Sequence, residues 1–301
     1  MASFSFGSRA ALSFNLAPKV WLRQLALTSL HLAAFYIGVL ILAAPGVLLV
    51  EKLAPADLQL VTRVGLQSIS VVLSFAVITM FLRWRGRWSL ADIGWSATPD
   101  SARGFGAGTA IGAFMAVAAI ALGVIGGAGR LTLDGAGFGS YLGAFLPLAG
   151  ILLFAALAEE VLFRGYPLLK LSKLIGKSGA SIMMAVGFAA VHLANPSVSA
   201  IGLVNIALAS LVLSAIFFTR GGLAAAWGLH LGWNAGLAAF DAPVSGLRFD
   251  LPMLDYHWGT PVWLSGAGFG PEGGAAASIV LVASLALIVR RLRTTSQVQL
   301  A

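Results

Sequence analysis

The sequence predicts an all-α membrane protein, folded as one polytopic bundle of about eight transmembrane helices. Of its 301 residues, 59% are hydrophobic and only 10% are charged, and the mean hydropathy is +0.92. Soluble domains carry about 25% charged residues. The apolar residues form long runs, and Lys and Arg gather in the short stretches between those runs. Both patterns are typical of membrane-spanning helices.

Eight segments reach or approach the length of about 20 apolar residues that crosses the hydrocarbon layer. The predicted helices cover residues 25–50, 60–82, 104–126, 142–165, 179–194, 198–219, 222–240 and 274–292. The first run is longer than the core of about 7–15 residues in a signal peptide, so we expect it to remain as a helix. We expect residues 1–301 to form one integral-membrane domain, with residues 241–273 as a structured cap.

Lys and Arg are unevenly divided between the two sides of this predicted bundle. If the N-terminus is cytoplasmic, 15 of the 19 fall on the cytoplasmic side. The other side receives only Lys52, Arg63, Arg130 and Arg248. This bias predicts that both termini lie in the cytoplasm. The net charge of +8 is therefore interpreted as a topology signal and not as a nucleic-acid surface.

Several ionisable or amide side chains lie inside these apolar runs. A charged side chain at the centre of a transmembrane helix costs about 2.5–3.5 kcal/mol on insertion scales. Such residues usually pair, line a cavity or take part in chemistry. The residues concerned are Glu159, Glu160, Arg164, His192, His230 and Asn234.

Helical spacing separates the two adjacent glutamates. Glu160 and Arg164 are four residues apart and share one helix face, so they can form an ion pair. Glu159 points about 100° away from Glu160, and the residue four positions after it is Phe163. We therefore expect Glu160 and Arg164 to give structural support and Glu159 to face another partner. Alternatively, both glutamates reach toward the interface from the end of the helix.

The remaining polar groups are expected at overlapping depths in the membrane. With a rise of 1.5 Å per residue and a helix that enters near Gly179, His192 lies roughly 20 Å deep. His230 and Asn234 lie roughly 14 Å and 20 Å deep, and Glu159 between about 8 Å and 20 Å. Three helices thus bring these side chains to one level, which predicts a common site.

This set of side chains suits hydrolysis of an acyl bond. A glutamate can act as general base on water, and an imidazole can position the proton. A second imidazole and a carboxamide can donate to a developing oxyanion. Alternatively, Glu159, His192 and His230 could bind Zn²⁺, since two histidines and a glutamate form a catalytic ligand set. The chain has no cysteine and no H-E-x-x-H pattern, so we favour a metal-free mechanism without a cofactor.

Three motifs carry a resemblance to a known family. EEVLFR at 159–164 matches EExxxR, FAAVH at 188–192 matches FxxxH, and HLGWN at 230–234 matches HxxxN. In this order they resemble the CAAX-protease and bacteriocin-processing (CPBP) family of intramembrane proteases. The stretches TRGGLAAAWGLH and WLSGAGFGPEGG also resemble segments of bacterial members, which implies a bacterial inner (plasma) membrane.

The resemblance implies a catalytic core at about residues 141–240 with a site open to the cytoplasm. It implies that Glu159 and His192 activate water while His230 and Asn234 hold the oxyanion. The implied substrate is a membrane-associated protein or peptide, which could be lipidated or CAAX-like.

Two other classes of protein share single features with this sequence. The segment GKSG at 176–179 resembles the G-x-S-G of rhomboid serine proteases, but Ser178 is expected at the membrane boundary, too far from His230 for a catalytic dyad. A non-catalytic immunity, scaffold or transporter-like protein would also carry buried polar groups. The sequence shows no inverted repeat of the kind common in transporters.

Overall fold

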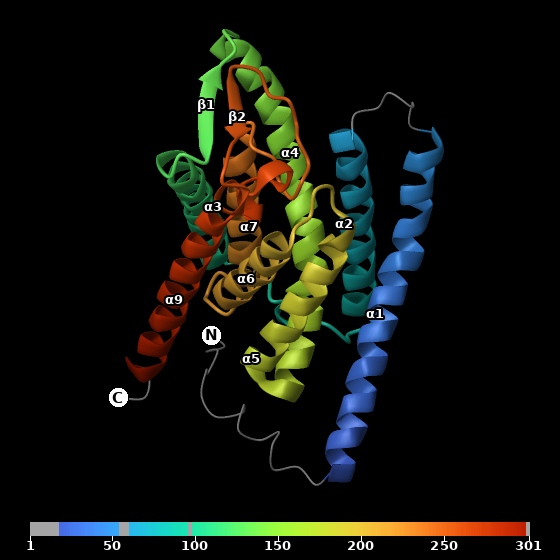
Figure 1. Cartoon of the computed structure of the whole chain (residues 1–301). Coiled ribbons are helices and arrows are strands. Elements are labelled where there is room, and N and C mark those ends of the chain that lie inside the picture. The colour runs from blue at the N-terminus through green and yellow to red at the C-terminus, as the bar shows by residue number, and fades with distance from the viewer. Residues whose placement is uncertain (1–17, 54–59, 96–97, 299–301) are drawn as a thin grey trace.

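The computed structural model describes residues 18–53, 60–95 and 98–298, which form a helical bundle (Figure 1). Each of the eight predicted segments is a helix, so the all-α class is confirmed. The long helices are α1 (Pro18–Leu53), α2 (Leu60–Trp84), α3 (Pro99–Ile125), α4 (Phe138–Phe163), α5 (Tyr166–Val191), α6 (Ala200–Phe217), α7 (Gly222–Ala238) and α9 (Ala275–Val298). The short elements are α8 (Val262–Ser265) and the 3₁₀ turns η1 (Leu90–Ile93), η2 (His192–Ala194), η3 (Ala267–Phe269) and η4 (Pro271–Gly273).

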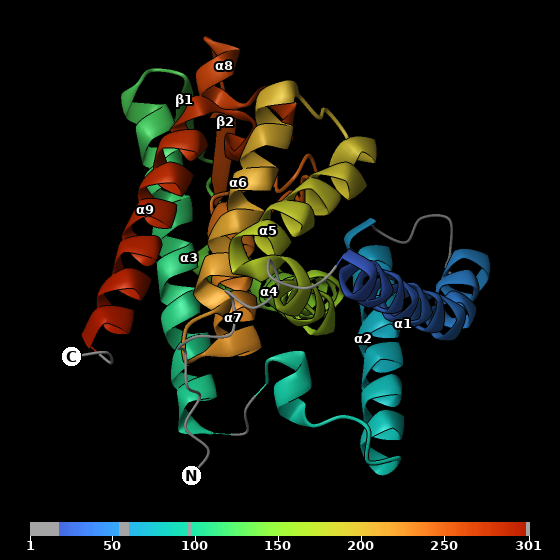
Figure 2. The same cartoon turned by 90° about the horizontal axis from the view of Figure 1, so that it is seen from below.

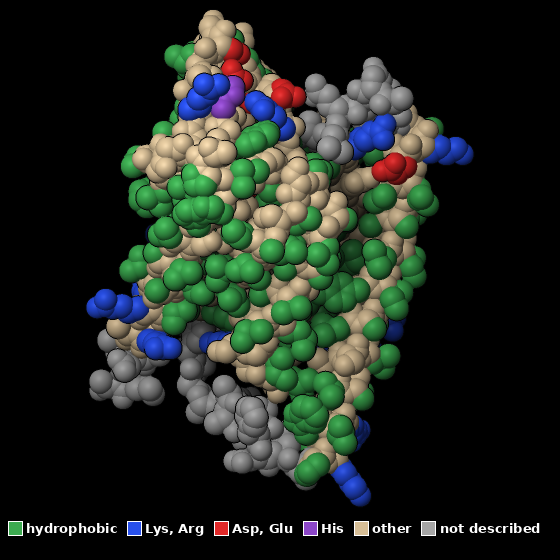
Figure 3. Space-filling model, in the orientation of Figure 1, with side chains coloured by type: hydrophobic (Ala, Val, Ile, Leu, Met, Phe, Trp, Pro, Cys, Tyr) green, Lys and Arg blue, Asp and Glu red, His purple; other side chains and the backbone are tan. Residues whose placement is uncertain are grey.

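The outer surface of the bundle suits a lipid environment. Within the described residues, six helical stretches are long and apolar enough to cross a membrane. Helices α4 and α5 together form one of these six stretches. Helix α7 has 17 residues and is not among them. Figure 3 shows a broad area of hydrophobic side chains between a lower group of Lys and Arg and an upper group of mixed charges. The protein is therefore an integral membrane protein.

Helices α4 to α7 lie in the middle of the bundle, and the other long helices lie on either side of them (Figures 1 and 2). Helices α1 and α2 lie side by side at one edge of the molecule, and α3 and α9 lie at the other (Figures 1 and 2). The first residue of α1 and the last residue of α9 lie at the same end of the bundle, the lower end in Figure 1.

A small structured cap covers the opposite end. The strands β1 (Gly129–Leu133) and β2 (Leu254–Trp258) pair antiparallel, with Gly129 opposite Trp258. The expected cap at 241–273 is therefore present, although no strand was predicted in it. At its start, Asp241 accepts hydrogen bonds from Arg248 and from the Leu251 amide, both at 2.9 Å. Burial raises the pKa of Asp241, and these two donors oppose the rise.

The boundary between α4 and α5 differs from the prediction. Helix α4 ends at Phe163, and α5 begins at Tyr166 and not near residue 179. Pro167 lies in the first turn of α5, where its missing N–H costs no hydrogen bond. Gly176, at φ 76° and ψ 164°, divides α5 at a kink. The part of α5 before this kink is amphipathic and buries Leu168, Leu171 and Leu174. A search for long apolar runs does not detect such a helix.

Helices α3 and α7 pack at unusually close range because glycines form their contact. A Cβ atom at Gly112 would overlap the carbonyl oxygen of Leu229, and a Cβ atom at Gly232 would overlap that of Thr109. Small residues of this kind let the backbones of membrane helices approach each other. Helix α3 thereby fixes the position of α7, which carries two of the predicted site residues.

Candidate active site

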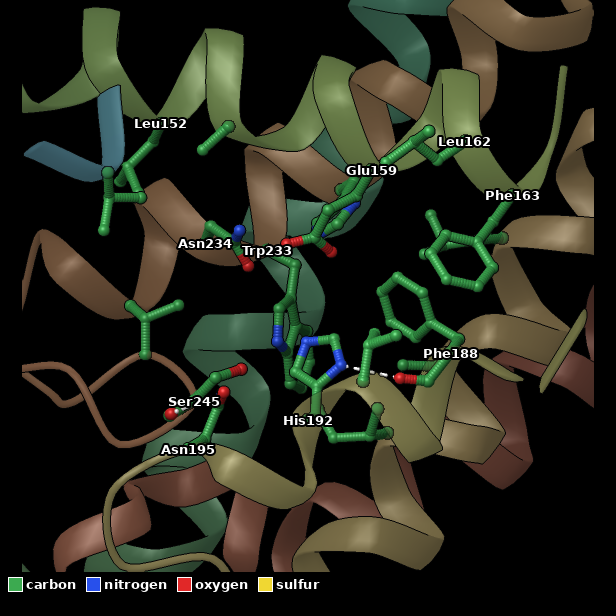
Figure 4. Close-up of a pocket in the computed structure, with 18 of the residues that line it drawn as sticks. Leu152, Glu159, Leu162, Phe163, Phe188, His192, Asn195, Trp233, Asn234 and Ser245 are labelled. Atoms are coloured by element: carbon green, nitrogen blue, oxygen red, sulfur yellow. Dashed lines mark hydrogen bonds and ion pairs between the residues drawn. The ribbon is translucent and has the colours of Figure 1, made fainter. Parts of the chain in front are cut away.

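The four predicted catalytic residues border one cavity of about 530 Å³ inside the bundle. Glu159 comes from α4, His192 from η2, and His230 and Asn234 from α7. Figure 4 shows Glu159, His192 and Asn234 facing this cavity from different elements. The structure therefore brings together all the residues that the sequence placed in one site.

Glu160 and Arg164 form a fully buried ion pair beside the cavity. The Arg164 Nη1 atom lies 3.1 Å from Glu160 Oε1, and both side chains are 0% exposed. The Nη2 atom donates to the Ser210 hydroxyl at 2.8 Å, and the guanidinium carbon lies 4.3 Å from the centre of the Phe188 ring. The pair that helical spacing predicted is present, and it joins α4 to α5 and α6.

Glu160 has a second contact that the sequence did not predict. The same Oε1 atom lies 2.8 Å from Nδ1 of His230. Because an ionised carboxylate only accepts, His230 donates its Nδ1–H in this bond. The other ring nitrogen, Nε2, lies 3.7 Å from Glu159 Oε2. His230 thus stands between the two glutamates, and Glu160 fixes the orientation of its ring.

His192 is oriented by the backbone of its own helix. Its Nδ1 lies 2.7 Å from the carbonyl oxygen of Phe188, an atom that can only accept, so Nδ1 carries the hydrogen. In the neutral ring, Nε2 then keeps its lone pair. This second nitrogen faces Glu159 and Asn234 in Figure 4. His192 is therefore arranged as a hydrogen-bond acceptor toward the cavity.

The Glu159 carboxylate is available for a ligand. Its side chain is 37% exposed, whereas that of Glu160 is 0% exposed. The Oε2 atom of Glu159 is buried and has no hydrogen-bond partner among the described residues. Buried polar atoms are nearly always hydrogen-bonded to protein or water. This oxygen is therefore suited to hold a water molecule or a substrate group.

Four further polar residues border the cavity and escaped the sequence analysis, namely Asn195, Trp233, Ser245 and Glu272. The Asn195 amide donates to the Ser245 carbonyl at 3.0 Å, and the Trp233 indole donates to Glu272 Oε1 at 2.7 Å. Asn195 follows His192 by three positions and Trp233 precedes Asn234. Ser245 and Glu272 lie in the cap, and the WLSGAGFGPEGG stretch contains Glu272 without marking it as a site residue.

The residues do not form a metal centre as they are arranged. Within the described ranges, no three His, Cys, Asp or Glu side chains come together in a way that could hold a metal ion. Zinc binding by Glu159, His192 and His230 stays the alternative to the metal-free mechanism. Ser178, the residue of the alternative serine mechanism, is exposed on α5 and is not among the cavity-lining residues.

Comparison with known proteins agrees with the motifs. Residues 141–236 match the family model described as type II CAAX prenyl endopeptidase Rce1-like. No curated protein and no solved structure matches the chain. The matched segment contains all three motifs and confirms the resemblance predicted from them. Over residues 141–236, this integral membrane protein is therefore similar to the Rce1-like family of membrane endopeptidases.

Proposed function

We propose that this protein is an intramembrane endopeptidase that hydrolyses a peptide bond of a membrane-associated substrate. The observation that carries the proposal is the shared cavity, into which Glu159 presents a carboxylate with an unpartnered oxygen. His192 presents Nε2 to the same space, and its bond to Phe188 leaves this nitrogen as the acceptor of the neutral ring. The family match supports a protease, and the roles of the individual residues are our inference.

In the proposed mechanism, a water molecule lies between Glu159 and His192. Glu159 removes one proton from this water as general base, and His192 Nε2 accepts a hydrogen bond from the other. The water oxygen then forms a bond to the carbonyl carbon of the substrate. When the carbon–nitrogen bond breaks, the proton held by Glu159 passes to the leaving amine. The products are one new carboxyl group and one new amino group.

His230 and Asn234 stabilise the negative charge that develops on the carbonyl oxygen. The side-chain amide of Asn234 has two N–H donors. His230 already donates its Nδ1–H to Glu160, so donation from Nε2 as well requires an imidazolium ring. Donors that are held in place before the reaction lower the barrier because they need no reorganisation. Glu160 and Arg164 support this arrangement without contacting the substrate.

The walls of the cavity suggest a substrate with an apolar segment. Helices α1 and α2 contribute Tyr36, Val39, Leu40, Ala43, Val64 and Val71. A hydrocarbon chain or an apolar helix would gain stability by burial against these side chains. We propose a lipidated or CAAX-like substrate, in line with the description of the matched family.

We further propose that the cavity is reached from the cytoplasm of a bacterial cell, with the protein in the inner membrane. Fifteen of the 19 Lys and Arg residues support a cytoplasmic location of both termini. The first residue of α1 and the last residue of α9 lie at one end of the bundle, as this topology requires (Figure 1).

The test compares the membrane proteomes of cells that carry the wild type, Glu159→Ala or His31→Ala. His31 lies on α1 and is not among the residues that line the cavity, so this variant is the matched control. We expect new C-terminal or juxtamembrane cleavage products with the wild type and with His31→Ala, and none with Glu159→Ala. Equal products from all three strains at matched expression would favour a non-catalytic immunity or scaffold role.

A further inference from the structure

A second buried carboxylate borders the cavity and is not used in the proposed mechanism. Glu272 lies in η4, shortly before α9, and the residue is only 4% exposed. It lines the same cavity as Glu159. Over the described ranges, no Lys, Arg or His lies within ion-pair distance of it. A buried carboxylate without a cation is costly unless its oxygens are well hydrogen-bonded.

Three neutral donors satisfy the Glu272 carboxylate. The Trp233 indole N–H donates to Oε1 at 2.7 Å. The backbone N–H of Ser245 donates to Oε2, and the Ser245 hydroxyl donates to the same oxygen at 3.0 Å. Hydrogen bonds to an ionised acceptor are about twice as strong as neutral ones. One carboxylate thus fixes a residue of α7 and a residue of the cap at the same time.

Each of these two contacts leads to a residue of the proposed catalytic set. Trp233 is followed directly by Asn234 on α7. On the other side, the Ser245 carbonyl accepts from the Asn195 amide at 3.0 Å, and the Asn195 backbone N–H donates to the carbonyl of His192 at 3.1 Å. Glu272 is therefore connected to both His192 and Asn234 by short, continuous paths.

The backbone of Glu272 is itself anchored. Asn205 on α6 donates to the Glu272 carbonyl at 2.7 Å and to the Gly274 carbonyl at 2.9 Å. The Asn205 oxygen accepts from Ser278 of α9 at 2.7 Å. The chain segment that carries Glu272 is thus held between α6 and α9, and the carboxylate acts from a fixed position.

We propose that Glu272 is a positioning residue for catalysis. It holds His192 in place through Ser245 and Asn195, and Asn234 in place through Trp233. This inference rests on the proposed function, because the two residues that it positions are those that contact the water and the oxyanion. It assigns a catalytic task to the cap, which lies outside the matched family segment.

The first test is Glu272→Gln in the full-length protein, reconstituted in liposomes with a peptide substrate from the proteome comparison. Glutamine has one accepting oxygen and an amide that cannot accept, so either Trp233 or Ser245 loses its partner. We expect kcat to fall about 10- to 100-fold and KM to change less than about two-fold, because the lost interaction acts in the transition state. Glu272→Asp, which keeps both oxygens, should recover part of kcat.

Matched variants separate this role from general damage. Glu51→Gln removes the same charge from α1, where Glu51 is exposed and accepts from Gln67 at 2.7 Å, and it should leave kcat unchanged. If Glu272→Gln does not fold, Trp233→Phe removes only one donor and should lower kcat in the same direction. An unchanged kcat in Glu272→Gln, or a rise in KM alone, would overturn the proposal.

A second readout does not depend on peptidase activity. In protein labelled with ¹⁵N-histidine, the ring nitrogens report the hydrogen bonds of each imidazole. We expect the His192 ring signals, assigned with His192→Ala, to shift in Glu272→Gln while those of His31 stay in place. If His192 does not shift, the positioning role is wrong even in an active enzyme. If His192 shifts but no variant cleaves anything, the proposed function fails and the structural link stands.

Discussion

Glu160 Oε1 lies 2.8 Å from His230 Nδ1 and 3.1 Å from Arg164 Nη1, so one oxygen holds both a histidine of the cavity wall and a fully buried cation. The neighbouring Glu159 shares neither contact at hydrogen-bond distance and faces the cavity. Adjacent carboxylates therefore have different tasks. Glu160 keeps the site assembled, and Glu159 is free for a ligand.

This division predicts that two similar substitutions differ in their effect on folding stability. Glu160→Gln leaves Arg164 buried without its counter-charge, which should cost about 3–5 kcal/mol of folding stability. Glu159→Gln should change stability little, because its side chain is 37% exposed and has no ion pair with Arg164. Thermal unfolding of the two variants in the same detergent tests this difference. Equal losses of stability would show that the two glutamates are not separated as described.

The sequence predicted this separation because it depends on helix geometry alone. Residues four apart share a face in any straight helix, and α4 is continuous up to Phe163. The contact between Glu160 and His230 could not be predicted in the same way. It depends on how α7 packs on α4, and no local spacing records that distance.

The sequence also predicted the presence of each helix better than the residues at which the helices begin and end. The apolar runs were long enough to identify all eight helices, but the first half of α5 carries Lys170 and Lys173 and lacks a continuous apolar run. The cap was recognised only as a structured loop. Its Glu272 reaches Trp233 of α7, and no spacing in the sequence indicates how the cap packs against that helix.

The glycines between α3 and α7 give a prediction about packing. Gly232→Ala and Gly112→Ala place a methyl group against backbone atoms of the facing helix. Such overpacking should destabilise the protein by about 1–3 kcal/mol and displace His230 and Asn234. Gly106→Ala is the matched control, because a Cβ atom there meets nothing within 4 Å on the same helix. Thermal unfolding and cleavage rate should both fall in the first two variants and stay unchanged in the control.

Removal of the oxyanion donor should have a large effect on rate alone. Asn234→Ala is expected to lower kcat by about 10²–10³-fold, the usual loss when one such donor is removed. KM should change little, since the donor acts mainly on the charge that develops in the transition state. Steady-state kinetics on the reconstituted enzyme measure both constants. A rise in KM with unchanged kcat would instead place Asn234 in substrate binding.

The proposed protonation state of His230 predicts that kcat/KM falls at high pH. His230 must carry hydrogens on both nitrogens to donate from Nε2, so the rate should fall at high pH as the ring loses one. Asn234→Ala should keep this fall at high pH. A rate that keeps rising at high pH would contradict the imidazolium role.

The proposed mechanism uses water activated by side chains, so it predicts insensitivity to metal removal. Dialysis against a strong chelator should leave the cleavage rate within about two-fold of its starting value, less than 1 kcal/mol in barrier height. Elemental analysis of the purified protein provides the second measurement. Loss of activity with chelator, restored by stoichiometric Zn²⁺, would establish the alternative in which Glu159, His192 and His230 bind zinc.

The most direct test of the central claim measures cleavage of one identified substrate peptide by Glu159→Gln in liposomes. Glutamine preserves the size of the side chain but cannot act as a general base. We predict a fall in kcat of at least about 100-fold, with the thermal midpoint near that of the wild type and with His31→Ala fully active. Cleavage by a folded Glu159→Gln at the wild-type rate would contradict the assignment of Glu159 as the residue that activates water.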